Sequence, residues 1–461
     1  MTFNSFSFIF IFLPLTLILF HILRAKGYFE HAKTIIIFAS LTFYSLGSSA
    51  SLPILITSIL FNYLMGLQIS SIKKNSKYED TDKKLKAIFV FALSMNLILL
   101  SYYKYFSFLP LGISFFTIMQ IMYIVDCFQG LIKPNNLKSH LLAVSFFPSV
   151  VMGPILKIKN ISTQFDDLDS HQLDYGKIAS GIFLFSIGLF KKVVIADSFA
   201  RVADSIYSAE YKVSMLEAWV GSISFSMQLY FDFSGYSDMA FAIAIMLGIT
   251  IPINFNSPYQ AKSLTEFWRK WHISLSNFIT TYLYTPIVRS FKKISFNKML
   301  FATFISMLIA GIWHGSKYTF VIFGAMHGIG LVINQLRKKS KRKLPSFLAI
   351  LVTFIYVNIS FIFFRANTVE QALSIIYSLI TPSFALSANN ITSTIRSSEL
   401  LEIGLPILIG LVVVLARSNS NFYFKNFKPT PIYGFYFILL SLISFLYMNS
   451  NMASGFLYVD F

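Results

Sequence analysis

Long apolar stretches dominate this chain, and each is close to the ~20 residues that a helix needs to cross about 30 Å of hydrocarbon. Only 13% of the 461 residues are charged, whereas soluble domains carry roughly 25%. A membrane β-barrel would instead need segments of about ten residues with alternating hydrophobicity, and segments such as 183–195 and 405–415 do not alternate. The sequence therefore predicts an all-α, polytopic integral membrane protein.

The candidate spans cover residues 5–23, 33–48, 52–70, 87–103, 111–129, 141–156, 178–190, 214–232, 233–250, 298–312, 318–336, 346–364, 400–416 and 432–449. The first span lacks a basic leader and a clear cleavage site, so we expect a retained helix rather than a signal peptide. Prolines and glycine interrupt 141–156, so this segment is either a crossing or a re-entrant segment covered by protein or water. We expect about 11 to 14 transmembrane or re-entrant helices in one integral domain, residues 1–461.

Lysine and arginine indicate which connections face the cytoplasm, because cytoplasmic loops carry an excess of both. The basic connections are 71–86, 251–297 and 337–343. Placing them in the cytoplasm puts the N-terminus outside and requires 141–156 to cross. The assignment puts His272 on the cytoplasmic side and His314 toward the opposite face. It also accounts for the net charge of +18 without nucleic acid as a partner, because the basic residues form short clusters between spans.

Other classes of site find little support in the sequence. The single cysteine, Cys127, excludes an internal disulfide framework and a cysteine-rich metal site. A zinc site would need three or four close ligands, and no histidine has a histidine or glutamate at i+3 or i+4. The phosphate-binding pattern GxxxxGK is absent as well. We therefore expect neither a metal nor a nucleotide-driven motor in this chain.

His314 is the most informative polar residue, because it lies near the end of an apolar run in Gly311-Ile312-Trp313-His314-Gly315. An ionisable side chain at membrane depth is unfavourable, so a histidine there indicates function. Trp313 would provide a flat aromatic wall, and Gly315 would permit close approach of a backbone or substrate. A neutral imidazole in this place can accept a proton from a hydroxyl. The alternative is a buried structural histidine.

A second histidine, His272, lies in the polar segment 263–277. Ser263 and Glu266 match a capping box, which marks a helix N-terminus. Four of the following residues share one helical face, which predicts an amphipathic helix in or near the membrane interface. These residues are Phe267, Trp271, Ser274 and Leu275.

Two interpretations of this predicted helix are open. It either lies on the membrane surface, with anchoring tryptophans and basic side chains that reach water, or it presents His272 and Ser276 to a polar passage. The spacing of three residues between Glu266, Arg269 and His272 favours the polar passage.

Three carboxylates lie in otherwise apolar stretches: Asp126, Asp232 and Asp238. An aspartate at the centre of a bilayer costs roughly 2.5–3.5 kcal/mol on insertion scales. Each carboxylate is therefore expected to be paired or to line water. Structural pairing with Lys or Arg is the alternative to a role in a functional site.

The ordered set of motifs resembles the membrane-bound O-acyltransferase (MBOAT) family, specifically its bacterial branch of alginate and peptidoglycan O-acetylation. The resemblance covers most of the chain, with the core motifs in residues 110–335 or so. The matching segments are 110–116 (PLGISFF), 123–126 (YIVD), 146–154 (FFPSVVMGP), 191–197 (KKVVIAD), 230–238 (YFDFSGYSD), 267–276 (FWRKWHISLS), 311–315 (GIWHG) and 363–366 (FFRA).

The resemblance implies an O-acyltransferase that moves an acetyl group from a cytoplasmic thioester donor, such as acetyl-coenzyme A, toward a polysaccharide outside. No tightly bound cofactor is implied. His314 is implied to be catalytic, as the base for the acceptor hydroxyl, and His272 to position the donor or stabilise the oxyanion. The helices would enclose a central tunnel. Residues that would line or support it are Trp313, Gly315, Trp271, Arg269, Asp232, Asp238 and Ser276.

The resemblance also implies a bacterial cytoplasmic (inner) membrane location, contact with membrane lipids, and a periplasmic or extracytoplasmic partner protein that transfers acetyl groups. Relatives that D-alanylate teichoic acid share the Trp-His-Gly motif, so D-alanyl transfer is one alternative. A proton-coupled polysaccharide transporter or flippase is another, although transporters often have related halves and none is visible here. A non-catalytic membrane scaffold is a third.

Overall fold

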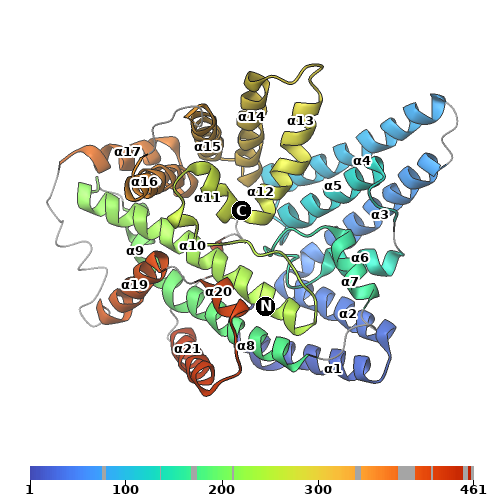
Figure 1. The fold of residues 1–461 in the computed structure, drawn as a ribbon, viewed down its shortest axis with the longest axis horizontal. Helices are drawn as coiled ribbons and strands as arrows, with labels where there is room; N and C mark the ends of the chain where they lie inside the picture. The colour runs from blue at the N-terminus through green and yellow to red at the C-terminus, as the bar shows by residue number, and fades with distance from the viewer. Residues whose placement is uncertain are drawn as a thin grey trace.

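The structure is a computed structural model that describes residues 1–74, 79–134, 136–167, 174–209, 212–337, 344–382, 400–416, 419–449 and 455–457. Within these ranges the chain is helical and contains no β-strand (Figure 1). Parts of two connections considered above lie outside the described residues, namely 75–78 and 338–343. The predicted all-α architecture is confirmed.

The N-terminal elements are η1 (Phe8–Phe12), α1 (Leu13–Ala25), α2 (Phe29–Gly47), η2 (Ser49–Ser51), α3 (Leu52–Lys74), α4 (Glu79–Tyr105) and α5 (Ile113–Gln129), where η marks a short 3₁₀ or π segment. The middle elements are α6 (Leu137–Ser145), α7 (Ile158–Asp166), α8 (Tyr175–Phe190), η4 (Lys191–Ala196), α9 (Asp197–Tyr207) and α10 (Met215–Met246). The C-terminal elements are η5 (Pro258–Gln260), α11 (Leu264–Lys270), α12 (Ile273–Phe278), η6 (Ile279–Tyr284), α13 (Thr285–Arg289), α14 (Phe296–His314), α15 (Tyr318–Arg337), α16 (Ser346–Arg365), α17 (Val369–Ile380), α19 (Leu400–Leu415), α20 (Ser420–Lys425) and α21 (Pro431–Asn449).

Among the described residues, eight helices are long and apolar enough to cross a membrane. They are Phe8–Ala25, Ser49–Lys74, Asp82–Tyr105, Tyr175–Tyr207, Phe296–His314, Tyr318–Arg337, Ser346–Arg365 and Pro431–Asn449. Each overlaps a predicted span, and helices also form over the predicted spans 33–48, 111–129 and 400–416. The chain is therefore a polytopic helical membrane protein.

The prediction of two spans at 214–232 and 233–250 is wrong, because α10 is one continuous helix of 32 residues. It packs along α8 and α9, which join through η4 into a helix of 33 residues. Asp232, Ser234 and Gly235 lie within this helix, where the two predicted spans were divided. The helix continues through these residues because Lys192 of η4 pairs with the Asp232 carboxylate. In addition, Gly235 lets the backbones of α8 and α10 approach each other closely.

The prediction that 141–156 crosses the membrane is also wrong. The helix ends at Ser145, and the following residues form buried turns that lead to α7. Side chains satisfy backbone groups of this segment: Phe147 donates its N–H to Ser40 Oγ at 3.1 Å, and Ile155 donates to Ser274 Oγ at 3.0 Å. Irregular backbone at membrane depth is tolerated when protein covers it, which agrees with the re-entrant alternative. The sidedness derived from the loop charges relied on this crossing and stays a prediction.

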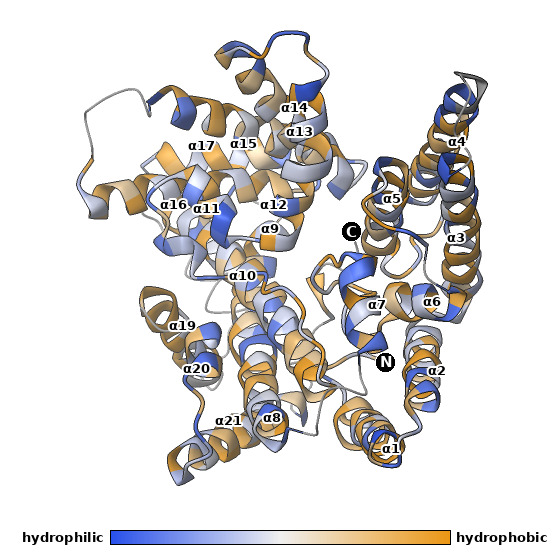
Figure 2. Ribbon diagram, turned by 45° about the vertical axis from the view of Figure 1, so that its right-hand side comes forward, coloured by the Kyte–Doolittle hydropathy of each residue, from blue (hydrophilic) through white to orange (hydrophobic). Residues whose placement is uncertain are grey.

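Two groups of helices flank α10. One contains α3, α4 and α5, which pack on one another, and the other contains α14, α15 and α16. Apolar residues cover much of α3, α4, α19 and α21 in Figure 2, as expected for helices that face lipid. The ends of α4 and α14 meet between the two groups, where Tyr105 donates its hydroxyl to the Ile312 carbonyl at 3.3 Å. This junction positions the candidate site.

Candidate active site

His314 is the last residue of α14, and it is only 5% exposed. Its imidazole lies among the rings of Phe364, Phe323 and Phe320, at centroid distances of 5.0, 5.9 and 6.2 Å. A Cβ atom on Gly315 would lie 2.7 Å from the Phe320 ring, so glycine is needed for this close packing. The predicted close approach at Gly315 is made by a phenylalanine that helps to enclose His314.

Close helix packing fixes the position of His314. A Cβ on Gly311 would lie 2.6 Å from Gly324 Cα, and one on Gly324 would lie 2.7 Å from the Met307 carbonyl oxygen. Small residues let two membrane helices approach closely. α14 and α15 therefore meet at Gly311 and Gly324, one turn before His314.

His272 occupies a break between two short helices. α11 ends at Lys270, α12 starts at Ile273, and His272 has a left-handed backbone with φ of 42°. The predicted continuous amphipathic helix is therefore wrong. Asn254 stabilises the break, because its carbonyl accepts from Ile273 N–H at 3.0 Å and its side chain accepts from Ser274 N–H at 3.2 Å.

The His272 ring is buried, with an exposed fraction of 1%. Phe233 packs edge-on against it at 4.7 Å. Neither ring nitrogen has a hydrogen-bond partner within the described ranges. Leaving a buried polar group unsatisfied costs about 1–3 kcal/mol. This cost is the strongest indication that the His272 ring binds a substrate group that the protein itself does not provide.

The two histidines share one aromatic cluster. Phe115 contacts both the His272 ring, at 6.5 Å, and the Trp313 ring, at 6.2 Å. His272 and His327 are also close enough to act electrostatically on His314. The two imidazoles therefore lie beside the same aromatic residues, because the break at His272 turns this segment into the protein interior.

Lys104, which the sequence reasoning missed, comes to the same cluster from α4. Its ammonium donates a hydrogen bond to the Trp313 carbonyl and lies 5.1 Å from the centroid of the Trp313 ring. It also acts electrostatically on His314. The only local signal was a single cation at the end of an apolar stretch, which commonly indicates a snorkelling side chain.

A third histidine, His327 on α15, lies behind the cluster. The indole N–H of Trp268 donates to its Nδ1 at 3.2 Å, and Ser360 Oγ lies 2.9 Å from its Nε2. Because an indole can only donate, Nδ1 must accept, and a neutral ring then donates from Nε2 to Ser360. Both nitrogens are thus satisfied, which assigns His327 a structural role.

Arg269 and Ser276 line a cavity of about 760 Å³ between α11, α12 and η6 on one side and α14 and α15 on the other. Trp268 forms part of its wall, so the cavity adjoins the residues that hold His327. The predicted cluster of Glu266, Arg269 and His272 does not form. Glu266 instead pairs with Lys270 at 2.8 Å, Arg269 is exposed, and His272 is buried.

The capping box predicted for α11 forms only in half. Ser263 Oγ accepts from the Glu266 N–H at 3.2 Å, but Glu266 accepts from the Lys262 N–H at 2.9 Å. Trp271 does not anchor at an interface, because it is 3% exposed and packs against Phe255 at 5.1 Å. The interpretation of this segment as a membrane-surface helix is therefore wrong.

Asp232 and Asp238 do not join the histidines. Lys192 pairs with Asp232 at 2.7 Å and with Asp197 at 2.8 Å. Lys191 pairs with Asp238 at 2.7 Å. Structural pairing, the alternative considered from the sequence, is confirmed for both carboxylates.

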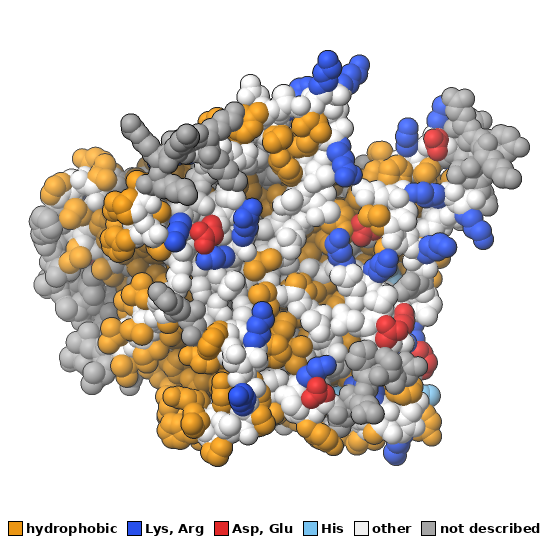
Figure 3. All heavy atoms as spheres, viewed as in Figure 1, with side chains coloured by type: hydrophobic (Ala, Val, Ile, Leu, Met, Phe, Trp, Pro, Cys, Tyr) orange, Lys and Arg blue, Asp and Glu red, His pale blue; other side chains and the backbone are white. Residues whose placement is uncertain are grey.

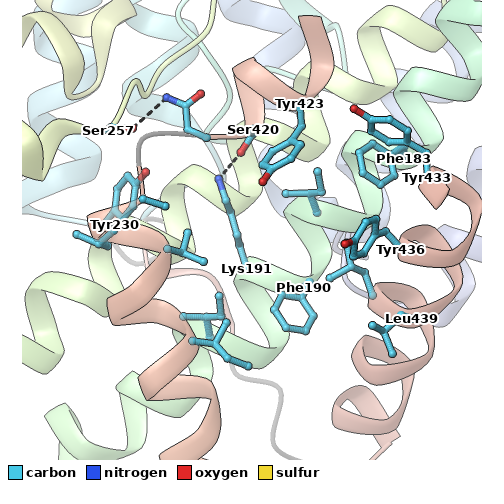
Figure 4. Close-up of a pocket in the computed structure, with 18 of the residues that line it drawn as sticks. Phe183, Phe190, Lys191, Tyr230, Ser257, Ser420, Tyr423, Tyr433, Tyr436 and Leu439 are labelled. Carbon is cyan, nitrogen blue, oxygen red and sulfur yellow. Dashed lines mark hydrogen bonds between the residues drawn. The ribbon is translucent and has the colours of Figure 1, made fainter. Parts of the chain in front are cut away.

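Lys191 also donates to Ser420, which accounts for its direction in Figure 4. It lines a largely apolar cavity of about 560 Å³ with aromatic residues such as Phe183 and Tyr433. The third carboxylate, Asp126, accepts from the Tyr282 hydroxyl at 2.8 Å. In the parts of the chain that are described, no three His, Cys, Asp or Glu side chains gather as metal ligands.

The chain is similar to known proteins over most of its length. The sequence profile of MBOAT, the membrane-bound O-acyltransferase family, matches residues 41–370. The chain is 34% identical to the "Peptidoglycan O-acetyltransferase" of Helicobacter pylori, over 100% of this chain and 97% of that protein. It is 31% identical to the "Probable alginate O-acetylase AlgI" of Pseudomonas putida, over 94% and 90%. It is 28% identical to the "Teichoic acid D-alanyltransferase" of Streptococcus thermophilus, over 55% and 68%.

The chain therefore belongs to the membrane-bound O-acyltransferase family. It is an O-acyltransferase, and the resemblance noted from its motifs is confirmed.

Proposed function

We propose that this protein moves an acetyl group from a cytoplasmic thioester donor across the membrane for O-acetylation of an envelope or secreted polysaccharide, with His314 as the general base. The observation that carries the proposal is the shared cluster of two buried histidines. His314 is enclosed by phenylalanines, and His272 has no hydrogen-bond partner at either nitrogen in the described structure. We infer that a substrate enters between the two rings.

The cavity beside Arg269 and Ser276 supports donor entry from the basic side of the molecule. Its walls include the first half of α14, and the connection that precedes this helix carries Lys292 and Lys293. Figure 3 shows Lys and Arg side chains around the α13–α14 connection and at the ends of α3 and α4. Such a surface attracts the phosphates of acetyl-coenzyme A or an acidic carrier protein.

The length of α4 supports a position of the acceptor on the face opposite the basic connections. The helix has 27 residues, so it is about 40 Å long. It begins beside the basic connection 71–86 and ends at Lys104 and Tyr105, which contact the residues before His314. A donor from the basic side and an acceptor from the other side would thus meet at the histidines through a tunnel in the protein.

The proposed step is a direct acyl transfer. The acceptor hydroxyl oxygen attacks the thioester carbonyl, and its proton goes to a neutral His314. The ester C–O bond forms, the C–S bond breaks, and the thiolate takes the proton back from His314. His272, when it carries a proton on the facing nitrogen, can donate to the developing oxyanion. The apolar cage excludes water, which would otherwise compete as the acceptor.

Acetyl is favoured over D-alanyl transfer by the extent of similarity. The two acetylating relatives align with nearly the whole chain, whereas the D-alanyltransferase aligns with 55% of it. We propose peptidoglycan or an alginate-like polymer as the acceptor, the bacterial inner membrane as the location, and an extracytoplasmic partner protein that completes delivery.

The test uses His314→Ala, with His31→Ala as a matched control at an exposed histidine of α2. Right-side-out vesicles containing the full-length protein and its acceptor are loaded with labelled acetyl-coenzyme A. His314→Ala should lower the rate of polymer acetylation about 10²- to 10⁴-fold, and His31→Ala should leave it unchanged. Full activity of folded His314→Ala would overturn the assignment of the base. Label transferred from a D-alanyl carrier but not from acetyl-coenzyme A would favour the alternative donor.

A further inference from the structure

A separate cavity of about 350 Å³ lies where α5 ends and α7 begins, with α6 forming part of its wall. Its lining includes Gly130, Lys133, His140, Ile158 and Lys159. α5 ends at the same end of the bundle as α3, since Lys73 near the end of α3 donates to the Phe128 carbonyl at 2.9 Å. The cavity therefore lies on the side of the basic connection 71–86, away from His314.

Two lysines give this cavity, here named the Lys133–Lys159 cavity, a positive rim. Both side chains are exposed, and neither forms an ion pair with any described residue. No aspartate or glutamate belongs to the lining. Asp126 acts electrostatically on Lys159 without forming an ion pair with it, so two lysines face one nearby carboxylate and the rim keeps a positive charge that would attract an anion.

The first turn of α7 faces the same space. This helix has nine residues, and its N-cap residue Lys157 makes no capping side-chain bond. Ile158 and Lys159, the first two residues of the helix, line the cavity. The first N–H groups of a helix lack intrahelical partners and carry partial positive charge, which suits an anion.

His140 supplies an independent sign of a ligand. Its ring forms part of the cavity wall, is 1% exposed, and packs against Tyr123 at 4.4 Å. Its Nε2 has no hydrogen-bond partner in the described structure. Burial lowers the pKa of His140 to about 3, so the ring is neutral and offers one N–H donor. A buried hydrogen-bond donor or acceptor without a partner is unfavourable, as at His272.

A purely structural interpretation explains only part of this arrangement. Lys159 Nζ lies 3.4 Å from the Leu131 carbonyl oxygen, and Lys73 binds the Phe128 carbonyl, so both satisfy backbone groups at the end of α5. Cations are favourable at a helix C-terminus. This role leaves Lys133 and the Nε2 of His140 without a function.

We propose that the Lys133–Lys159 cavity binds a phosphate group, held by the two lysines, the first turn of α7 and His140. Two sources share this chemistry, the headgroup of an anionic phospholipid and the phosphate of a soluble nucleotide. The cavity lies at the end of membrane helices, where both can reach it. The inference does not depend on the acyl-transfer step, because it uses none of the residues near His314.

The test compares the full-length wild type with Lys133→Ala/Lys159→Ala. A matched control, Lys425→Ala/Lys428→Ala, removes the same charge from exposed lysines at the end of α20, outside both proposed sites. Each protein is placed in nanodiscs of phosphatidylcholine alone or with phosphatidylglycerol, and 3′,5′-ADP is titrated into the phosphatidylcholine discs. Thermal unfolding midpoint and apparent Kd are measured.

A lipid source predicts that phosphatidylglycerol raises the midpoint of the wild type and of the control but not of the cavity variant. A soluble source predicts the same pattern with 3′,5′-ADP, with an apparent Kd at least about tenfold weaker in the cavity variant. Lys133→Arg/Lys159→Arg, which keeps the charge, should bind like the wild type and guards against misfolding of the alanine variant. Equal responses of the wild type and the cavity variant to both probes would overturn the proposal.

Discussion

Two groups of polar side chains are buried to the same degree in this protein. Lys192, in the group formed by η4 and α10, is 1% exposed, and so is His272, in the group between α11, α12 and α14. Lys192 binds two carboxylates, and Lys191 binds a third. His272 binds nothing at either nitrogen among the described residues.

The difference teaches how buried polar residues divide between structure and function. A buried charge must be paired, so the lysine–aspartate group is saturated by the protein itself. In the histidine group, the His272 ring nitrogens lack hydrogen-bond partners among the described residues. This lowers the stability of the fold, and packing elsewhere must offset the loss. Burial alone therefore does not identify a site, whereas burial without a partner does.

The largest expected effect is on folding, from Lys192→Met. This change leaves Asp197 and Asp232 buried without their shared cation, at a cost of about 3–5 kcal/mol. We expect little folded protein by size-exclusion chromatography in mild detergent, whereas the exposed Lys292→Met should behave like the wild type. Normal yield and thermal stability of Lys192→Met would show that the ionic group is not required for the fold.

His272→Phe should have the opposite profile. Because the imidazole has no partner to lose, thermal stability should stay equal or rise. Acetyl transfer should fall about 10²- to 10³-fold, as for the loss of an oxyanion donor. The measurement is the rate per folded molecule together with the unfolding midpoint. A destabilised variant with unchanged activity would place His272 with the structural residues.

His327→Phe tests the third buried imidazole, whose nitrogens are both satisfied. The change leaves the Trp268 indole N–H and the Ser360 hydroxyl without their partner, at a cost of about 1–3 kcal/mol. We expect a lower unfolding midpoint and a rate per folded molecule within a few-fold of the wild type. A loss of activity as large as that of His272→Phe, at normal stability, would contradict the structural role.

The smallest effect concerns an exposed ionic group, which tests whether burial gives the lysine–aspartate group its importance. Hydrogen bonds from Lys138 and Lys33 lower the pKa of Glu30 to about 2, below its unfolded value of about 4.3. This carboxyl therefore adds stability above about pH 4.3, and the contribution is lost as pH falls toward 2. Because Glu30 is largely exposed, Glu30→Gln should cost at most about 1 kcal/mol at pH 7. Chemical denaturation at pH 7 with low and 1 M salt checks this, since salt should abolish the difference.

The membrane-spanning helices could be predicted because bilayer thickness sets the length of an apolar run. The continuity of α10 could not, since Asp232 and Gly235 look like an interruption until the lysines of η4 are placed beside them. The break at His272 was missed for a related reason. The apolar residues on both sides of it keep helical spacing, and the reversal depends on Asn254, which lies earlier in the chain.

His314 and His272 were found because ionisable residues in apolar surroundings are conspicuous. Lys104 and the role of His327 were not found, because their contacts join distant parts of the chain: Lys104 and Trp313 are 209 residues apart, and Trp268 and His327 are 59 apart. No local pattern encodes such pairs. For the same reason, the sequence alone did not show that Asp232 and Asp238 pair with lysines of a neighbouring helical segment.

The ion pairs between η4 and α10 have a consequence for biogenesis. Lys191 and Lys192 are synthesised before Asp232 and Asp238, so the cations reach the membrane first. Neither helix can enter lipid alone without exposing charge to hydrocarbon. The earlier helix carries only Asp197 as a partner for Lys192, so we expect it to enter the hydrocarbon together with α10, which supplies Asp232 and Asp238. A chain that ends between residues 207 and 232 would leave Lys191 without its carboxylate and Lys192 with Asp197 alone.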